Sequence, residues 1–277
     1  MIRRIFLVMF IAFSGYSFPA FAQGDLLITP HRVVFEGNKQ KEELNLANMG
    51  KDTAIYSISF VQKRMNENGS FVNIVDADSG QMFSDPYLRI FPRQVTLAPG
   101  EAQVVALQYR RKPDMVAGEY RSHLYFRSEK NYTPLGMDDS DRDSTILSVQ
   151  LIPVFGMSIP IIIRTGAVSV SAALSDFKLN TQPNARQNLT FTIHRTGNIS
   201  LYGDIMVVYV PDKGKPYPVC TAAGVGVYTC INKRYMEVKL NNTSGIPLGN
   251  GKLKVQYISK GKTKKPVVYA EGELDIN

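Results

Sequence analysis

Acidic side chains at alternate positions are the first feature of this 277-residue chain whose spacing could support chemistry. The run Asp139-x-Asp141-x-Asp143 resembles the start of a calcium-binding loop, in which alternate carboxylates ligate the ion. Its sixth position, however, is Ser144 instead of glycine, and its twelfth is Gln150 instead of glutamate. We therefore interpret the segment as a solvated loop with no metal site.

The histidines and the glycine-rich segments give no sign of catalysis. His31, His123 and His194 lie far apart in the chain, and three histidines with two cysteines are too few to favour a zinc site of several ligands. Gly224-x-Gly226 lacks the third glycine of a dinucleotide-binding loop, and the chain has no Gly-x-Ser-x-Gly segment. A Ser/His/Asp set assembled by folding stays open. The sequence predicts a protein that is not an enzyme and needs no cofactor.

The two cysteines, Cys220 and Cys230, flank Ala223-Gly224-Val225-Gly226, a segment with the composition of a turn. This spacing suits a hairpin closed by a disulfide. Loop entropy gives a bridge of that span a stabilising effect of about 2–3 kcal/mol. We predict that the two cysteines are joined, provided that the chain folds in an oxidising compartment.

The first 22 residues predict such a compartment. Arg3 and Arg4 precede an apolar run from Ile5 to Phe13, and the segment ends in Ala20-Phe21-Ala22. A basic start, a short apolar run and a small-x-small end are the three parts of a cleaved signal peptide. The apolar run is too short to cross a bilayer, which needs roughly 20 residues. We expect export, cleavage after Ala22 and no membrane insertion of the mature chain.

The overall charge argues against nucleic acid as a partner. The chain has 32 basic and 24 acidic residues, and loss of Arg3 and Arg4 with the signal peptide would leave an excess of six. That bias is mild, and it lacks the clustered basic stripe of a nucleic-acid-binding protein.

Beyond the signal segment, hydrophobicity alternates in short stretches separated by turn residues about every ten positions. No stretch keeps a helical apolar period over three turns. The sequence therefore predicts an all-β fold of two sandwiches with immunoglobulin-like sizes. The apolar alternations that predict strands are Ala54, Tyr56, Ile58 and Phe60; Val105, Leu107 and Tyr109; Leu189, Phe191 and Ile193; Val238 and Leu240; and Leu253, Val255 and Tyr257.

The boundary between the two domains is predicted after Ile163. There Arg164-Thr165-Gly166 interrupts a strand-like stretch, and a fresh alternation begins at Val168. The expected units are a signal peptide over 1–22, a first domain over 23–163 and a second over 164–277. A polar, acidic stretch from Glu129 to Ser144 is expected to be a long loop between two strands of the first domain.

The tract from Thr145 to Arg164 has an apolar face that is unusually long for one strand. Alternate positions are apolar from Leu147 to Ile163, whereas a strand of a sandwich usually has five or six residues. Two interpretations stay open. The tract is either two successive core strands with a bend near Pro153 or Gly156, or an edge strand whose apolar side chains bind another molecule.

Four motifs of this chain resemble those of the periplasmic chaperones of chaperone–usher pili, and the last motif is similar to the archaic branch in particular. They occur in the expected order behind a signal peptide and cover most of the first domain. The second domain matches only in its size and its β character. The motifs are His31–Gly37, Leu88–Gly100, Gly118–Leu124 and Val149–Arg164.

The resemblance implies two immunoglobulin-like domains set at an angle and a periplasmic assembly chaperone without catalytic activity. Such a chaperone lends a strand to an incomplete pilus subunit and delivers the subunit to an outer-membrane usher. It also implies that the free protein self-associates or co-purifies with subunits. The alternative is a secreted two-domain β-sandwich used as an adhesin or structural surface module, which should be an inert monomer.

The resemblance also assigns roles to particular residues. Arg32 falls on the family's cleft arginine, which binds the C-terminal carboxylate of the subunit, and Arg164 falls on an arginine that fixes the angle between the domains. The family's second carboxylate ligand, a lysine, is replaced here by Pro160. The alternatives for that role are Arg121 and Arg89, both expected to be exposed arginines on strands of the first domain. The positions that fill the groove of the subunit are Leu147, Val149 and Leu151.

Overall fold

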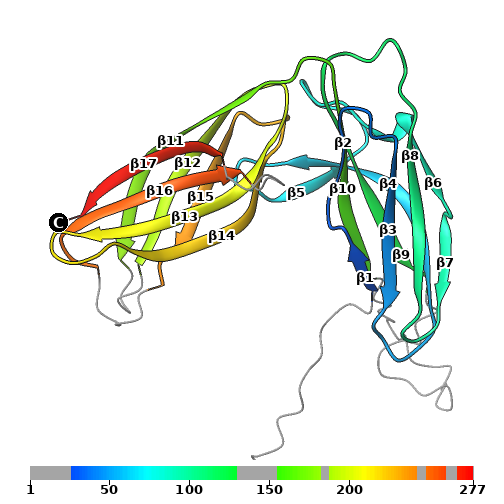
Figure 1. Cartoon of the computed structure of the whole chain (residues 1–277), viewed down its shortest axis with the longest axis horizontal. Coiled ribbons are helices and arrows are strands. Elements are labelled where there is room, and N and C mark those ends of the chain that lie inside the picture. Colours follow the sequence, from blue (N-terminus) through cyan, green and yellow to red (C-terminus); the bar gives the residue numbers. More distant parts are fainter. Residues whose placement is uncertain (1–25, 130–154, 182–186, 242–247, 260–266, 277) are drawn as a thin grey trace, which may run out of the picture.

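The structure, a computed structural model, describes residues 26–129, 155–181, 187–241, 248–259 and 267–276. The chain forms two β-sandwiches that lie at an angle to each other (Figure 1). This architecture confirms the predicted fold class. Within the described residues, the structure contains no helix of the length and apolarity that a membrane crossing requires.

The first sandwich packs a four-stranded sheet on a six-stranded sheet. In both sheets neighbouring strands are antiparallel, except that β10 and β2 are parallel. A short 3₁₀ helix, Asp85–Tyr87, precedes β6. The strands of the four-stranded sheet, in spatial order, are β1 (Leu26–Thr29), β3 (Lys41–Asn48), β8 (Ala102–Tyr109) and β6 (Leu88–Phe91). Those of the other sheet are β2 (Val33–Phe35), β10 (Gly156–Thr165), β9 (Gly118–Ser128), β4 (Ala54–Met65) and β5 (Phe71–Ile74), with β7 (Gln94–Leu97) also paired to β4.

The second sandwich is built in the same manner from a three-stranded and a four-stranded sheet. Its core and that of the first sandwich are separate apolar clusters. The three-stranded sheet contains β11 (Val170–Thr181), β12 (Gln187–Gly197) and β15 (Lys233–Lys239). The four-stranded sheet contains β14 (Tyr217–Val227), β13 (Leu201–Pro211), β16 (Gly251–Ser259) and β17 (Val268–Ile276).

The period-two alternations place their apolar residues in these cores. Val105, Leu107 and Tyr109 of β8 are buried in the first core, and Leu189 and Phe191 of β12 in the second. Side chains at alternate positions of a strand point to one face, so each alternation supplies one strand face to a core.

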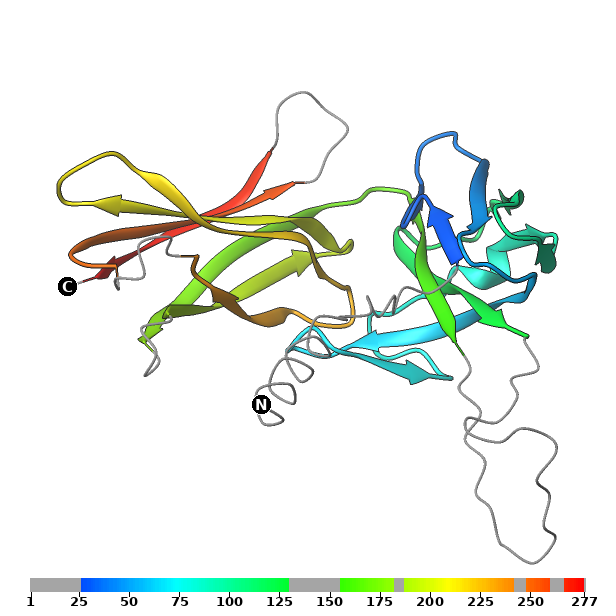
Figure 2. The ribbon, with the colours of Figure 1, turned by 90° about the horizontal axis from the view of Figure 1, so that it is seen from below.

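Two features connect the sandwiches. β10 ends at Thr165, and β11 of the second sandwich begins at Val170. The β4–β5 hairpin reaches from the first sandwich toward the second (Figures 1 and 2). At its turn, the amide of Tyr235 donates a hydrogen bond of 2.7 Å to the carbonyl of Glu67.

The predicted disulfide is wrong, because both cysteines are free thiols. Gly224 and Gly226 do not turn the chain back; they lie inside β14, which runs in one direction along β13 from Tyr217 to Val227. An extended chain rises about 3.3 Å per residue, so the seven steps from Cys220 to the end of β14 at Val227 already carry the chain roughly 20 Å from Cys220. A disulfide requires Cα atoms closer than about 7 Å.

Candidate functional site

A row of ionisable side chains on β9 faces the second sandwich. Glu119, Arg121 and His123 occupy alternate positions and so share one face, while Tyr120 and Leu124 on the opposite face belong to the core. The three ionisable side chains are only 1%, 4% and 4% exposed. Charged groups buried to this extent need partners, since removing an unpaired charge from water is costly.

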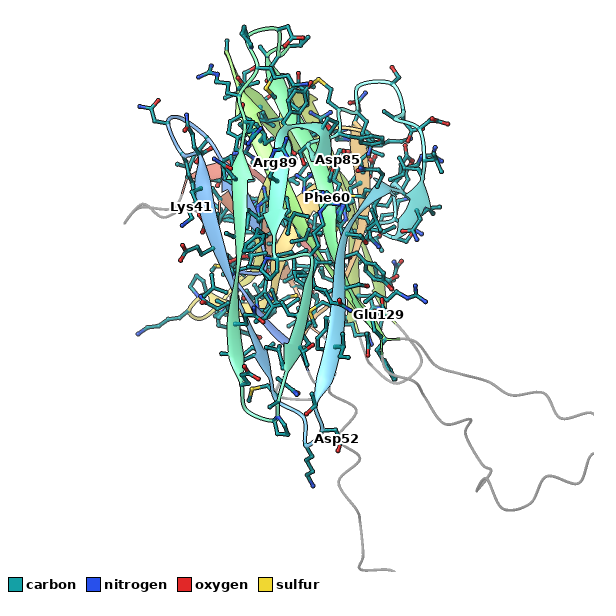
Figure 3. All side chains as sticks on the ribbon, turned by 90° about the vertical axis from the view of Figure 1, so that its right-hand side faces the viewer. Lys41, Asp52, Phe60, Asp85, Arg89 and Glu129 are labelled. Carbon is teal, nitrogen blue, oxygen red and sulfur yellow. The ribbon has the colours of Figure 1, made fainter. Side chains whose placement is uncertain are left out.

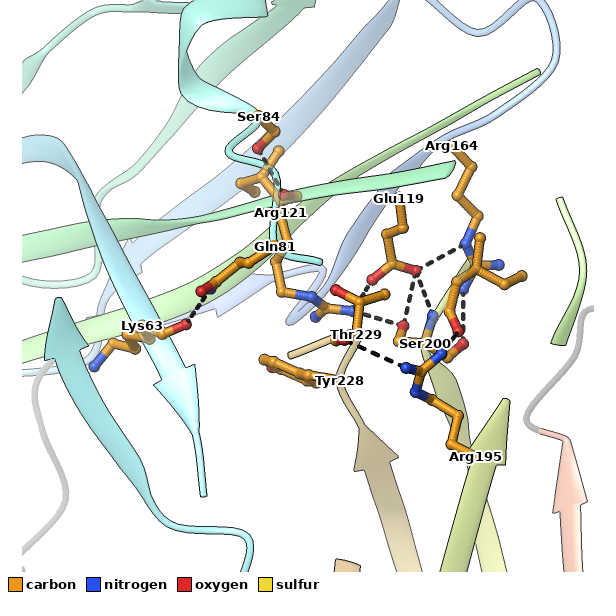
Figure 4. Close-up of polar contacts among 12 residues, drawn as sticks. Lys63, Gln81, Ser84, Glu119, Arg121, Arg164, Arg195, Ser200, Tyr228 and Thr229 are labelled. Carbon is orange, nitrogen blue, oxygen red and sulfur yellow. Dashed lines mark hydrogen bonds and ion pairs between the residues drawn. The ribbon is translucent and has the colours of Figure 1, made fainter. Parts of the chain in front are cut away.

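Glu119 lies at the centre of a polar cluster that joins the two sandwiches (Figure 4). Its Oε1 accepts a hydrogen bond of 2.5 Å from Nη2 of Arg121. Its Oε2 accepts hydrogen bonds from the amide of Ser200 at 3.1 Å and from the hydroxyl of Ser200 at 2.8 Å. Arg164 Nε adds a further bond to Oε2 at 3.2 Å. Ser200 directly precedes β13, so this one carboxylate links both sandwiches.

The electrostatics of the cluster favour the ionised carboxylate. Burial alone would raise the pKa of Glu119, but Arg121, Arg164 and the hydrogen bond from the Ser200 amide hold it at about 2. The same carboxylate, with Tyr228, raises the pKa of Arg121 against the opposing effect of burial. Glu119 and Arg121 are therefore both ionised at neutral pH.

Arg121 also stacks on an aromatic ring and keeps unused donors. Its guanidinium carbon lies 3.7 Å from the centroid of the Tyr228 ring, which follows β14 in the second sandwich (Figure 4). Nη2 bonds to Glu119 and to Ser200 Oγ at 2.7 Å. Nε and Nη1 of Arg121 are buried and have no hydrogen-bond partner. A donor left unpaired in this way costs free energy that a ligand acceptor would recover.

His123 continues the contact with Tyr228. The two rings stack with centroids 6.1 Å apart, and the Nε2 atom lies 3.5 Å from the Tyr228 hydroxyl. Burial, Arg121 and Lys63 together lower the pKa of His123 to about 3. The imidazole is thus neutral at physiological pH and contributes to packing.

Arg32, the predicted anion anchor, lies between the sandwiches. Its guanidinium carbon is 4.3 Å from the centroid of the Tyr202 ring on β13. Burial and the neighbouring Arg121 lower the pKa of Arg32 to about 10, which leaves it charged at neutral pH. Glu36, the acidic residue nearest to Arg32 in the sequence, does not pair with it and lies 3.7 Å from Arg164. No hydrogen bond or ion pair joins Arg32 to another residue that the structure describes.

Arg164, predicted to act between the domains, contacts both sandwiches. Besides Glu119 of the first, its Nη2 donates to the Ser200 carbonyl of the second at 3.4 Å. A further arginine, Arg195 on β12, orders the second sandwich beside this cluster. It donates to the carbonyl oxygens of Gly197, Ile199, Thr229 and Ile231 and to the Asn232 side chain.

The two alternatives for the second anchor cation occupy different places. Arg89 is exposed on β6, in the sheet that does not contain β9 (Figure 3). Arg121 was expected to be exposed and is instead buried, because the second sandwich covers that face of β9. Pro160, at the family's lysine position, pairs in register with His123, two residues along β9 from Arg121. The structure therefore brings Arg121 and Arg32 together and leaves Arg89 apart.

The described part of the apolar tract is buried along most of β10 and exposed where β10 begins. Ile159, Ile161 and Ile163 are buried in the first core, which fits the core interpretation of this part of the tract. Before them, Phe155 is 62% exposed and Met157 is 38% exposed. The predicted donor residues Leu147, Val149 and Leu151, the acidic stretch and the signal segment lie outside the described residues.

The second sandwich contains a Ser/His/Asp set, but its contacts differ from those of a catalytic triad. The Ser175 hydroxyl lies 2.7 Å from His194 Nε2 and donates to Asp176 at 2.7 Å. In a hydrolase the acid orients the imidazole, whereas here Asp176 binds the serine. Over the described part of the chain, no cluster of three His, Cys, Asp or Glu side chains is arranged to hold a metal.

Sequence reasoning missed the residues that hold these arginines: Glu119, Ser200, Tyr202 and Tyr228. The only signal for them was the Glu119-x-Arg121-x-His123 alternation, because three ionisable residues on one face of a strand beside a core face can indicate a second interface.

No family model and no curated protein matches this chain. Among solved structures, the chain is similar to a chain of the CsuC–CsuE chaperone–tip adhesion subunit pre-assembly complex from archaic chaperone-usher Csu pili of Acinetobacter baumannii. The identity is 13% over 89% of this chain and 99% of that chain, and the TM-score is 0.47. It is also similar to the YadV chaperone, at 13% identity over 91% and 100% of the two chains and a TM-score of 0.44. The Pseudomonas aeruginosa CupB2 chaperone has 10% identity over the same shares and a TM-score of 0.44.

Proposed function

We propose that this protein is a periplasmic chaperone that binds pilus subunits, holds them folded and delivers them to an outer-membrane usher, without catalysing a reaction. The observation that carries the proposal is the cluster of charged side chains between the sandwiches. Arg32 is desolvated there, has its guanidinium over the Tyr202 ring and lacks a hydrogen-bonding partner among the described residues. Arg121 beside it keeps two buried donors unpaired.

This arrangement fits a terminal carboxylate. A guanidinium grips a carboxylate with two parallel donors, and the bond strengthens in a partly desolvated site. Arg32 is the primary ligand in the proposal, and Arg121 supplies the second positive charge in place of the family's lysine. Among the described residues, Glu119 and Glu36 are the carboxylates that pair with the arginines of this cluster, and both pairs leave Arg32 without a counter-ion in contact. The C-terminal carboxylate of a subunit would supply that missing negative charge.

The apolar tract supplies the second part of the proposed function. The exposed Phe155 and Met157 show that the apolar face extends beyond the core at the start of β10. We place Leu147, Val149 and Leu151 in the groove of a subunit that lacks a strand, where alternate side chains set the register. The proposal includes removal of residues 1–22, domains over 23–163 and 164–277, Arg164 as the interdomain residue, and self-association of the free protein.

Replacing Arg32 tests the anchor. Hydrogen bonds to charged groups contribute roughly 1.5–3 kcal/mol, so Arg32→Ala should weaken capture of a subunit about tenfold to a hundredfold. The tagged protein is purified from periplasm, and co-purifying subunits are identified by mass spectrometry and quantified. Arg89→Ala is the matched control, because that arginine is exposed on the other sheet. Equal subunit recovery with Arg32→Ala, or no subunit with the unmodified protein, would contradict the proposal.

Replacing Val149 tests the donor strand. Val149→Glu places a charge where an apolar groove of the subunit would have to desolvate it, so the complex should be lost while the free chaperone stays folded. Ser148→Glu adds the same charge on the opposite face of the strand and should leave the complex intact. A pull-down and thermal melting separate the two effects. If Val149→Glu unfolds the first domain, its side chain belongs to the core.

A further inference from the structure

Both arginines of the proposed anchor stack on tyrosines that belong to the other sandwich. Arg32 precedes β2 and lies over Tyr202 of β13, at 4.3 Å from guanidinium carbon to ring centroid. Arg121 of β9 lies over Tyr228, at 3.7 Å. The cations thus come from the first sandwich and the aromatic platforms from the second.

Stacking and hydrogen bonding use different parts of a guanidinium. The cation–π contact occupies the flat face, while the five N–H donors point outward in the plane. A tyrosine under Arg32 therefore fixes the plane of the fork without consuming the donors that a carboxylate needs. An ion pair with an acidic residue in the same place would consume them.

We infer that Tyr202 is a positioning residue for carboxylate capture, so that the anion anchor is a site completed by both sandwiches. The inference rests on the proposed function. Arginine has a flexible side chain, and ordering it when the ligand binds lowers affinity. An aromatic ring that orders the guanidinium before the ligand binds removes part of that entropic cost. Tyr202 lies on β13 in register with Gly226, within a strand pair that fixes its backbone.

Nuclear magnetic resonance of the labelled mature protein tests this role with sodium acetate as the minimal carboxylate. The Nε–Hε resonance of Arg32 is assigned with the Arg32→Lys variant and followed during titration. Sodium chloride at equal ionic strength is the control. In Tyr202→Leu the affinity for acetate should fall about three- to tenfold, because a cation–π contact is lost. Tyr202→Phe keeps the ring and should stay within about twofold of the unmodified protein. Heteronuclear relaxation should also show that the Arg32 side chain is ordered in both ring-containing forms and mobile in Tyr202→Leu.

The outcomes separate the inference from the proposed function. If acetate shifts Arg32 in the unmodified protein and shifts it with equal affinity in Tyr202→Leu, the positioning role is overturned. If acetate acts no differently from chloride on the unmodified protein, the anchor itself fails. Tyr202→Met replaces Tyr202→Leu if thermal melting shows that the leucine variant is unfolded.

Discussion

Replacing Glu119 by glutamine removes the one carboxylate that Arg121 and Arg164 share, and the loss should appear as a large fall in stability. The amide keeps the size of the side chain, but it presents an NH₂ group where one carboxylate oxygen accepted bonds. Arg121, which already has two buried donors without partners, then keeps its charge with no counter-ion in contact. Leaving one member of a buried ion pair uncompensated costs about 3–5 kcal/mol.

The pKa of Glu119 gives an independent magnitude. Burial disfavours the carboxylate, but the two arginines and Ser200 hold the pKa at about 2 against an ordinary value of 4.5. A difference of that size corresponds to about 3 kcal/mol in favour of the folded, ionised form at neutral pH. With a urea dependence of about 2–3 kcal/mol per molar, the unfolding midpoint of Glu119→Gln should fall by about 1 M or more.

The pH dependence has a definite sign. Because the folded pKa is below the unfolded one, the stabilisation is complete above about pH 5 and is lost as the pH falls from there toward 2. Glu119→Gln should therefore lose less stability than the unmodified protein across this acidic range.

Urea unfolding at several pH values, followed by circular dichroism, measures both effects. Glu36→Gln is the control, since that carboxylate is exposed and 3.7 Å from Arg164, and it should cost less than about 1 kcal/mol. The reasoning is refuted if Glu119→Gln costs no more than Glu36→Gln, or if its stability follows the same acidic pH profile as that of the unmodified protein.

Two further predictions concern the second sandwich and the hairpin that reaches it. Without reductant, both Cys220 and Cys230 should react with Ellman's reagent, Cys220 slowly because burial raises the pKa of its thiol; a mass lower by two hydrogens would contradict this. Gly69→Ala should lower the thermal stability more than Gly100→Ala. Both glycines have positive φ, which costs an alanine about 1–2 kcal/mol, but only at Gly69 does a neighbour, the Arg234 guanidinium, occupy the place of the new methyl group. Equal melting temperatures would show that the Arg234 contact is irrelevant.

The fold was predictable because its signal is local. Alternation such as Leu189, Phe191 and Ile193 needs only neighbouring residues to indicate a buried strand face, and those side chains lie in the second core. The prediction of a disulfide was wrong for a related reason. Two glycines within four residues indicate a turn, but β14 continues past both of them. Gly224 has a positive φ at an irregularity of the β13–β14 pairing, and Gly226 pairs with Tyr202; this pairing depends on residues far away in sequence.

The charged cluster between the sandwiches was predictable only in part because its contacts are not local. Arg32 and Arg164 were identified through motifs of the first domain. Glu119 and Ser200 lie 81 residues apart in sequence, so nothing near either residue indicates the other. Arg121 was expected to be exposed, since a charged residue on a strand usually faces solvent and only the packed second sandwich buries it.

The β4–β5 hairpin gives the two sandwiches a third point of attachment, besides the connecting segment and the Glu119 cluster. A body held at one point keeps freedom to swivel, and a body held at separated points does not. The segment between β10 and β11, the Glu119 cluster and the Glu67–Tyr235 hydrogen bond are three such points. The two sandwiches are therefore expected to keep a fixed separation and angle. Adding glycines to the chain between Thr165 and Val170 should leave the separation of the sandwiches unchanged, because the other two attachments still determine it.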